Sequence, residues 1–387
     1  MADSEAPIRL SMAEVGPDDV EAVARAVRSG WLSPVGPALD QFERELADVT
    51  GRRFAVGLSS GTAALQLGLI ALGVQPGDEV WVATLTFVAT ANAVLHAGAR
   101  PTFFEVDPET WTIDAGLVRA ELDRRLAQGE PLPRAIVPVD LYGRCADLGD
   151  VEDVLRLHGV AVLTDAAESL GATVRGSPAG SRGDAAALSF NGNKIITTSG
   201  GGALLTDDPE VAERVRHLAT QARQPVRHYE HLEAGFNFRL SNVLAALGSS
   251  QLADLDGRVE RRRAIHARYL AGLSGLSGLR VVDPTRDLDD ASITAPSRWL
   301  TCIMLDPSRC AVDRDALIDL LEARSIECRP VWKPMHLQPL FQDSQTVGVE
   351  GGVSERAFRQ GVALPSGSGL TPAQVDRVVA SIRAALT

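Results

Sequence analysis

The feature that most constrains the fold is a regular alternation of short apolar runs with helical segments between residues 54 and 205. Strands are expected at 54–58, 79–83, 101–106, 135–139, 160–165 and 185–190, with a further strand ending at 205. These runs are apolar almost throughout, which is typical of strands buried on both faces of a sheet. The pattern therefore predicts an α/β fold with a mostly parallel central sheet and helices on both faces.

The segments around this region suggest two domains. Helices are expected at 17–29, 38–50, 63–72, 87–97, 117–126, 148–158, 209–222, 241–255 and 259–273, and residues 275–297 read as an exposed connection. A smaller α+β unit follows, with strands at 299–305, 326–329 and 362–364 and helices at 314–324 and 372–386. We expect a large domain at 15–255 and a small C-terminal domain at 256–387, with residues 1–14 packing near the small one.

Composition excludes some classes of function. The chain has 387 residues, a net charge of −12 and a pI near 5.1. This acidity disfavours nucleic-acid binding, which needs a basic face to neutralise phosphates. The four cysteines form no CxxC pair, so we expect no metal site and reduced thiols. No leader-like or membrane-spanning apolar run is seen, and the chain is expected to be cytoplasmic.

One lysine stands in a polar loop between two apolar strands. Lys194 lies in the segment SFNGNKIITTSGGG, beside Ser189, Thr197 and Thr198. Burial or a neighbouring charge can make such an amine a nucleophile toward a carbonyl compound. Taken alone, Lys194 is better interpreted as a solvated loop lysine, so a chemical role for it depends on two other features.

The first of these is a turn that leads into a helix, Ser60-Gly61-Thr62. Free N–H groups and the positive end of the helix dipole favour a phosphate there, and glycine lets the ligand come close. The alternative is a simple helix cap with no ligand.

The second is Asp165, at the carboxyl end of the strand VAVLTD. Ligands of open α/β sheets bind outside the carboxyl ends of the strands. A carboxylate there can keep a ring nitrogen protonated. The alternative is an aspartate that caps the following segment.

A phosphate site, a carboxylate and an amine, in this order on an α/β sheet, suit pyridoxal 5′-phosphate, with pyridoxamine 5′-phosphate as its intermediate form. Phe87 could stack on the cofactor ring, although a core position is an equal alternative. Glu168 and Asn191 are candidates for contacts around the cofactor or substrate, with core or capping roles as the alternative.

Several motifs extend this pattern along nearly the whole chain, among them GWLSPVGPALDQFE, SSGTAALQLGL, TFVATANAV, DLYG, TDAAESLGA, GFNFRLSN, RPVWKPMH and LPSG. The chain resembles the DegT/DnrJ family of sugar aminotransferases, within fold type I of the pyridoxal phosphate enzymes. The resemblance implies that Lys194 holds the cofactor covalently, Asp165 binds its ring nitrogen and Phe87 stacks on the ring. It also implies phosphate contacts from Gly61, Thr62 and Ser189.

The resemblance further implies a homodimer with shared active sites, because the family's residue matching Asn237 reaches the phosphate from the other subunit. L-Glutamate is the implied amino donor. Sugar 3-dehydratases of this fold carry histidine where Lys194 stands, so the lysine argues against that activity.

Three segments resemble a narrower group, namely TTSGGG at 197–202, HYEH at 228–231 and WKPMH at 332–336. That group aminates C4 of UDP-2-acetamido-2,6-dideoxy-4-hexulose. Alternatives are an aminotransferase for a dTDP-linked 3- or 4-keto sugar or for a cyclitol and, from a different class, a non-catalytic regulatory relative.

The nucleotide-linked keto sugar needs donors for its diphosphate and a wall for its rings. The candidate residues for this role are Trp31, Ser33, His228, Tyr229, Arg329, Lys333 and His336. The alternative for each is an ordinary surface position.

Overall fold

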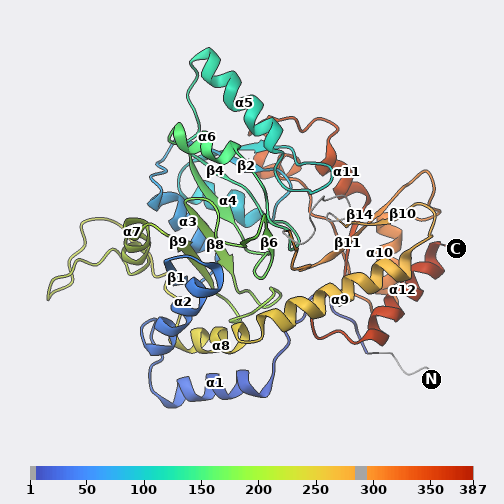
Figure 1. Ribbon diagram of the computed structural model, residues 1–387, viewed down its shortest axis with the longest axis horizontal. Helices are drawn as coiled ribbons and strands as arrows, with labels where there is room; N and C mark the ends of the chain where they lie inside the picture. Colours follow the sequence, from blue (N-terminus) through green and yellow to red (C-terminus); the bar gives the residue numbers. More distant parts are fainter. Residues whose placement is uncertain (1–5, 284–293, 387) are drawn as a thin grey trace.

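The structure is a computed structural model that describes residues 6–283 and 294–386. Its centre is an eight-stranded sheet of order β1-β9-β8-β5-β4-β2-β3-β13 (Figure 1). The strands are β1 Phe54–Leu58, β2 Glu79–Ala83, β3 Arg100–Phe104, β4 Ala135–Val137, β5 Ala161–Asp165, β8 Ala185–Ser189, β9 Gly202–Thr206 and β13 Gln345–Val347. Neighbours from β8 to β13 are parallel, and β9 is antiparallel to both β8 and β1. The predicted α/β fold is confirmed.

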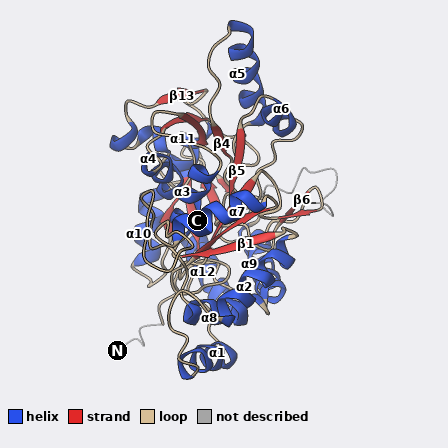
Figure 2. Ribbon diagram, turned by 90° about the vertical axis from the view of Figure 1, so that its left-hand side faces the viewer, coloured by secondary structure: helices blue, strands red, loops and turns tan. Residues whose placement is uncertain are grey.

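Helices cover both faces of this sheet, as the apolar strands require (Figure 2). Along β2, Trp81 belongs to the apolar cluster on one face, whereas Val80 and Val82 belong to the cluster on the other. The first cluster includes residues of α2 Pro37–Thr50, α5 Ala115–Gln128, α6 Val151–Leu157 and α8 Asn242–Leu252. The second includes residues of α3 Gly61–Ala71, α4 Val88–His96 and α7 Pro209–Ala219.

A second, four-stranded antiparallel sheet has the order β10-β11-β14-β12. Its strands are β10 Leu279–Val281, β11 Thr301–Leu305, β12 Arg329–Pro330 and β14 Gly361–Leu364. A third apolar cluster joins it to α9 Leu255–Leu273, α10 Arg314–Glu322 and α12 Pro372–Leu386. Ile8 is buried in this cluster and pairs with Ile326. Within the described residues, the remaining α-helices are α1 Pro17–Arg28 and α11 Val353–Gln360, and two short 3-10 helices span Met335–Leu337 and Pro339–Phe341.

Several predicted element boundaries were wrong in the C-terminal third. The strand predicted at 326–329 is reduced to β12, and the connection predicted at 275–297 contains β10; its residues 284–293 lie outside the described residues. The prediction also missed α11 and β13, and β13 joins the central sheet beside β3. The domain division at 255 and 256 stays a prediction.

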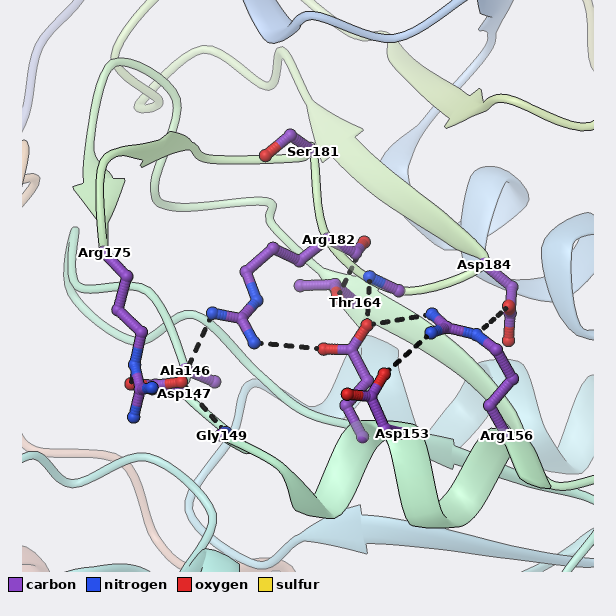
Figure 3. Close-up of polar contacts among 12 residues, drawn as sticks. Ala146, Asp147, Gly149, Asp153, Arg156, Thr164, Arg175, Ser181, Arg182 and Asp184 are labelled. Atoms are coloured by element: carbon purple, nitrogen blue, oxygen red, sulfur yellow. Dashed lines mark hydrogen bonds and ion pairs between the residues drawn. The ribbon is translucent and has the colours of Figure 1, made fainter. Parts of the chain in front are cut away.

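A chain of ion pairs ties the hairpin of β6 Thr173–Val174 and β7 Ser177–Pro178 to α6 (Figure 3). Asp147 pairs with Arg175 and Arg182, at 2.6 and 3.3 Å. Glu152 of α6 pairs with Arg182 and Arg156, both at 3.2 Å. These contacts anchor the chain between β5 and β8, two strands that carry predicted site residues.

None of the helices in the two described ranges combines the length and the apolar character that crossing a membrane would require.

Candidate active site

A cavity of about 660 Å³ opens at the carboxyl ends of the parallel strands. Its walls also include the N-terminal segment 9–12 and residues around β11, β12 and β14. Ten predicted site residues line it: Ser60, Gly61, Thr62, Phe87, Asp165, Glu168, Ser189, Asn191, Lys194 and Arg329. Folding thus brings together groups that are widely separated in the sequence.

The turn before α3 forms one wall of the cavity. The Ser60 side chain accepts a hydrogen bond of 3.0 Å from the N–H of Ala63 and so caps the helix. The first-turn N–H groups of Gly61 and Thr62 have no partner within their own helix, and both residues line the cavity. The turn can therefore both cap the helix and bind an anion, because the cap uses the N–H of Ala63 and leaves those of Gly61 and Thr62 free.

Close packing fixes this turn against β8 and β9. A Cβ atom on Gly202 would lie 2.5 Å from the Gly61 nitrogen, and one on Gly61 would lie 2.9 Å from the Ser189 Cβ. Glycine at both positions lets the two strands press against the turn. Ser189 is thereby placed directly beside the first helical residue.

Asp165 ends β5 as a buried carboxylate. Its Oδ2 accepts a 2.6 Å hydrogen bond from the Thr90 hydroxyl, and its Oδ1 accepts one of 3.2 Å from the Ala167 N–H. Burial raises the pKa of Asp165, while these donors and Lys194 act in the opposite direction. A cationic partner inside the cavity would favour the ionised form of this carboxylate.

Lys194 follows β8, and its amine reaches into the cavity. The Nζ lies 3.2 Å from Glu168 Oε1 and 4.2 Å from the centroid of the Trp299 ring. Glu168 Oε2 accepts a 2.9 Å hydrogen bond from the N–H of Tyr142. Burial raises the pKa of Glu168 to about 7, with the Lys194 charge opposing the shift.

Aromatic side chains form the wall that faces these groups. Trp332 lies 5.4 Å from Phe87 and 5.1 Å from Tyr142, measured between ring centroids. Trp299 stacks on Tyr142 at 6.2 Å. From the sequence, Phe87 was given a role, whereas Trp299 and the N-terminal segment were missed because no local pattern gives a signal for them. Tyr142, in the segment DLYG, and Trp332, in WKPMH, stood in quoted motifs without a role.

Seven predicted site residues lie outside this cavity within one chain: Trp31, Ser33, His228, Tyr229, Asn237, Lys333 and His336. Three of them are in the long segment between α7 and α8, which extends away from the body of the molecule (Figure 1). There Tyr229 is 78% exposed, and Asn237 Oδ1 accepts a hydrogen bond from Gln221 at 3.1 Å.

Trp31, Ser33 and His336 are held by contacts outside the cavity. Asn242 of α8 donates through its side chain to the Trp31 carbonyl at 3.0 Å, and its backbone N–H donates to the Ser33 carbonyl at 3.1 Å. His336 is enclosed instead of facing the cavity. Its Nδ1 lies 2.6 Å from the Thr84 hydroxyl, and its Nε2 lies 3.4 Å from Glu355.

The wall residues fit pyridoxal 5′-phosphate. The open N–H groups at Gly61 and Thr62 suit its phosphate, and the buried Asp165 carboxylate suits a protonated ring nitrogen. The sequence contains two lysines, Lys194 and Lys333, and Lys194 is the one that lines the cavity. A carbonyl carbon held in this cavity would therefore meet one amine.

Comparisons with known proteins agree with this geometry. Residues 14–383 match the DegT/DnrJ/EryC1/StrS aminotransferase family. The chain is 41% identical to EpsN of Bacillus subtilis (strain 168), named as a pyridoxal phosphate-dependent aminotransferase, over 96% of this chain and 94% of that protein. It is 38% identical to the GDP-perosamine synthase of Caulobacter vibrioides, over 93% of each.

A solved structure of DesV from S. venezuelae superimposes with a TM-score of 0.84 at 35% identity, covering 95% of this chain and 93% of that one. These similarities extend across both sheets and the cavity between them. The chain therefore belongs to the DegT/DnrJ/EryC1/StrS aminotransferase family, as a sugar aminotransferase that uses pyridoxal 5′-phosphate.

Proposed function

We propose that this enzyme moves an amino group from L-glutamate to C4 of UDP-2-acetamido-2,6-dideoxy-4-hexulose, giving the UDP-4-amino-4,6-dideoxy-N-acetylhexosamine. The observation that carries the aminotransfer is the meeting of Lys194, Asp165 and the Ser60–Thr62 turn in one cavity. The sugar is proposed from the segments at 197–202, 228–231 and 332–336.

In the proposed mechanism the cofactor supplies a conjugated ring that accepts electrons from the carbon beside the transferred nitrogen. Asp165 keeps a proton on the ring nitrogen, and the Thr90 hydroxyl holds the Asp165 carboxylate in place. The Lys194 Nζ would take a proton from the substrate carbon and return it to the carbon on the other side of the transferred nitrogen, two bonds away, which proximity favours.

The substrate end of the cavity carries both signs of charge. Arg329 lines it but also pairs with Glu327 at 2.9 Å and with Glu322 at 3.2 Å. Arg9, with its side chain 61% exposed, lies 4.0 Å from Glu327. We propose that the sugar diphosphate draws on Arg329 and Arg9, because guanidinium groups bind phosphate oxygens in pairs.

A GDP-linked keto sugar is the second candidate acceptor. The 38% identity to a GDP-perosamine synthase over 93% of the chain favours it. The aromatic wall suits the sugar of either candidate. An assay that compares the UDP-linked with the GDP-linked acceptor distinguishes the two.

The proposed enzyme is a homodimer with shared sites. His228, Tyr229 and Asn237 lie outside the cavity of their own chain, in the segment between α7 and α8. Part of this segment extends from the body of the molecule (Figure 1), while Asn237 pairs with Thr220 directly after α7. We propose that this segment enters the cavity of the second subunit, where Asn237 contacts the phosphate. The four thiols, none of them in a disulfide, support a cytoplasmic setting.

Mixing two inactive variants tests the shared site. Lys194→Ala and Asn237→Ala are each expected to lose most activity. If Asn237 serves the partner's site, a mixed dimer has one site with both defects and one intact site, so activity returns on mixing. If Asn237 serves its own site, both sites of the mixed dimer stay defective and mixing restores nothing.

A single-turnover assay tests the reaction itself. The protein is loaded with pyridoxamine 5′-phosphate, mixed with the UDP-linked 4-keto sugar without glutamate, and followed by absorbance and by the mass of the sugar. Formation of the 4-amino sugar is expected. Conversion of only the GDP-linked sugar would select the second candidate; conversion of only dTDP-linked sugars or cyclitols would overturn both. A yellow protein inert toward every donor would revive a regulatory role.

A further inference from the structure

Trp299 lies directly against the amine of Lys194. The Nζ is 4.2 Å from the indole centroid, and the tryptophan is only 3% exposed. The amine also lies 3.2 Å from Glu168 Oε1. The amine therefore contacts both a carboxylate and an aromatic face.

Side-chain contacts fix the indole from two directions. Its Nε1–H donates a 2.7 Å hydrogen bond to the carbonyl of Asn193, the residue that precedes Lys194. Its ring stacks on Tyr142 with an interplanar angle of 17°. The ring is thus tied to the same loop that carries the lysine.

The backbone of Trp299 is fixed as well. Its carbonyl accepts a 2.7 Å hydrogen bond from the buried Arg262. Gly143 adopts a φ of +95°, and a Cβ there would lie 2.5 Å from the Trp299 nitrogen. Such close contact leaves the tryptophan little freedom to move relative to the Tyr142–Gly143 turn.

We propose that Trp299 is a positioning residue for Lys194: its indole face holds the Lys194 amine beside the cofactor position whenever lysine and cofactor are not joined. A cation is attracted to an indole face, most strongly where water is excluded. The contacts with Glu168 and Trp299 together restrain the position of the amine. Without them, the lysine side chain would sample many rotamers. This inference rests on the role proposed for Lys194.

The aromatic cluster supplies a matched control. Trp111 is also buried, at 4% exposure, and its ring lies 6.5 Å from Tyr142. Unlike Trp299, it is not part of the cavity wall. Trp111→Leu therefore removes a buried indole next to the same tyrosine without touching the lysine.

The test compares Trp299→Leu, Trp299→Phe and Trp111→Leu in the full-length protein. Pyridoxal 5′-phosphate is added to cofactor-free protein, and the rate of its covalent attachment to Lys194 is followed by absorbance and borohydride trapping. We expect attachment to be about 10-fold slower in Trp299→Leu, because an amine that is no longer held beside the cofactor position meets the carbonyl carbon less often. Trp299→Phe keeps an aromatic face and is expected to be intermediate, and Trp111→Leu to match the wild type.

Amine labelling gives a second readout that needs no cofactor. Acetic anhydride acetylates Lys194 and Lys333, the two lysines of the sequence, so Lys333 is an internal reference. The ratio of Lys194 to Lys333 labelling is expected to rise several-fold in Trp299→Leu, because the amine is no longer held against the ring. Equal ratios and equal attachment rates in all three variants would overturn the proposal. A wild-type protein that traps no cofactor on Lys194 would instead overturn the proposed function.

Discussion

At the scale of single residues, the hydrogen bond from Thr90 holds the Asp165 carboxylate that we propose binds the cofactor's ring nitrogen. Thr90→Val keeps the shape but removes the donor of the 2.6 Å bond. A hydrogen bond to a charged group contributes about 1.5–3 kcal/mol, so we expect the half-reaction with glutamate to slow at least 10-fold. Stopped-flow absorbance measures the rate of this half-reaction.

Thr90→Ser is the matched control because it keeps the hydroxyl, and it should stay within a few-fold of the wild type. Equal rates in Thr90→Val and Thr90→Ser would mean that this hydroxyl has no part in holding Asp165.

Asp140 predicts a pH dependence of stability. It is buried next to Val139 of the cavity wall, and its carboxylate accepts hydrogen bonds from Ser169 and from the N–H of Ala146. Burial raises the pKa of Asp140 from 3.8 to about 7. Between these values the folded state holds the proton more tightly than the unfolded state, so the contribution of Asp140 to stability falls as pH rises from 4 to 7.

Asp140→Asn should therefore be more stable relative to the wild type at pH 8 than at pH 4, by on the order of 4 kcal/mol at most. Urea unfolding at both pH values measures this difference. If the free energies of unfolding of Asp140→Asn and the wild type differ by the same amount at both pH values, the pKa of Asp140 is not raised.

Residue-scale inference from the sequence singled out residues that the structure brings together, while their roles stay predictions. Lys194, Asp165 and the Ser60–Thr62 turn all line the cavity. Trp299 could not be found this way, because its contact with Lys194 depends on packing between distant segments. His336 was expected to face the substrate but is enclosed by Thr84 and Glu355.

At the scale of elements, the close approach of β9 to the turn before α3 should be essential. Gly202→Ala would place a Cβ 2.5 Å from the Gly61 nitrogen, a contact that backbone atoms cannot relieve without moving. We expect loss of cofactor affinity of at least 10-fold, together with reduced thermal stability. Equilibrium dialysis with pyridoxal 5′-phosphate measures the affinity.

Gly192→Ala is the control in the same segment, since its Cβ would meet nothing closer than 3.9 Å. If both variants bind the cofactor equally, the packing of β9 does not set the shape of the turn.

Element prediction followed the hydrophobic pattern. The buried strands β1, β2, β5 and β8 were predicted within about a residue because they are apolar runs between turns. By contrast, β13 has the sequence QTV at the edge of the sheet, with two of its three residues exposed, and gives no such signal. The helix α11 was missed because it is short and mostly polar.

At the scale of the whole molecule, the N-terminal segment links the small sheet to the cavity. Ile8 pairs with Ile326 and is 1% exposed, and the residues that follow it line the cavity wall. Ile8→Ala should cost about 2–4 kcal/mol of stability. Because the segment is loosened, we also expect KM for the sugar to rise.

Urea unfolding and steady-state kinetics measure both effects. Leu157→Ala on α6, at a position that is 80% exposed, is the control and should change neither. A stable Ile8→Ala protein with an unchanged KM would show that the segment does not depend on this anchor.

Whether Lys194 holds the cofactor in this cavity is measured most directly by borohydride reduction of the loaded protein followed by peptide mass spectrometry. The sequence has only two lysines to distinguish. We predict the cofactor mass on the peptide with Lys194, and a Lys194→Ala protein with neither the cofactor's linked absorbance nor turnover. Cofactor trapped on Lys333, or on neither lysine while turnover continues, would contradict the account.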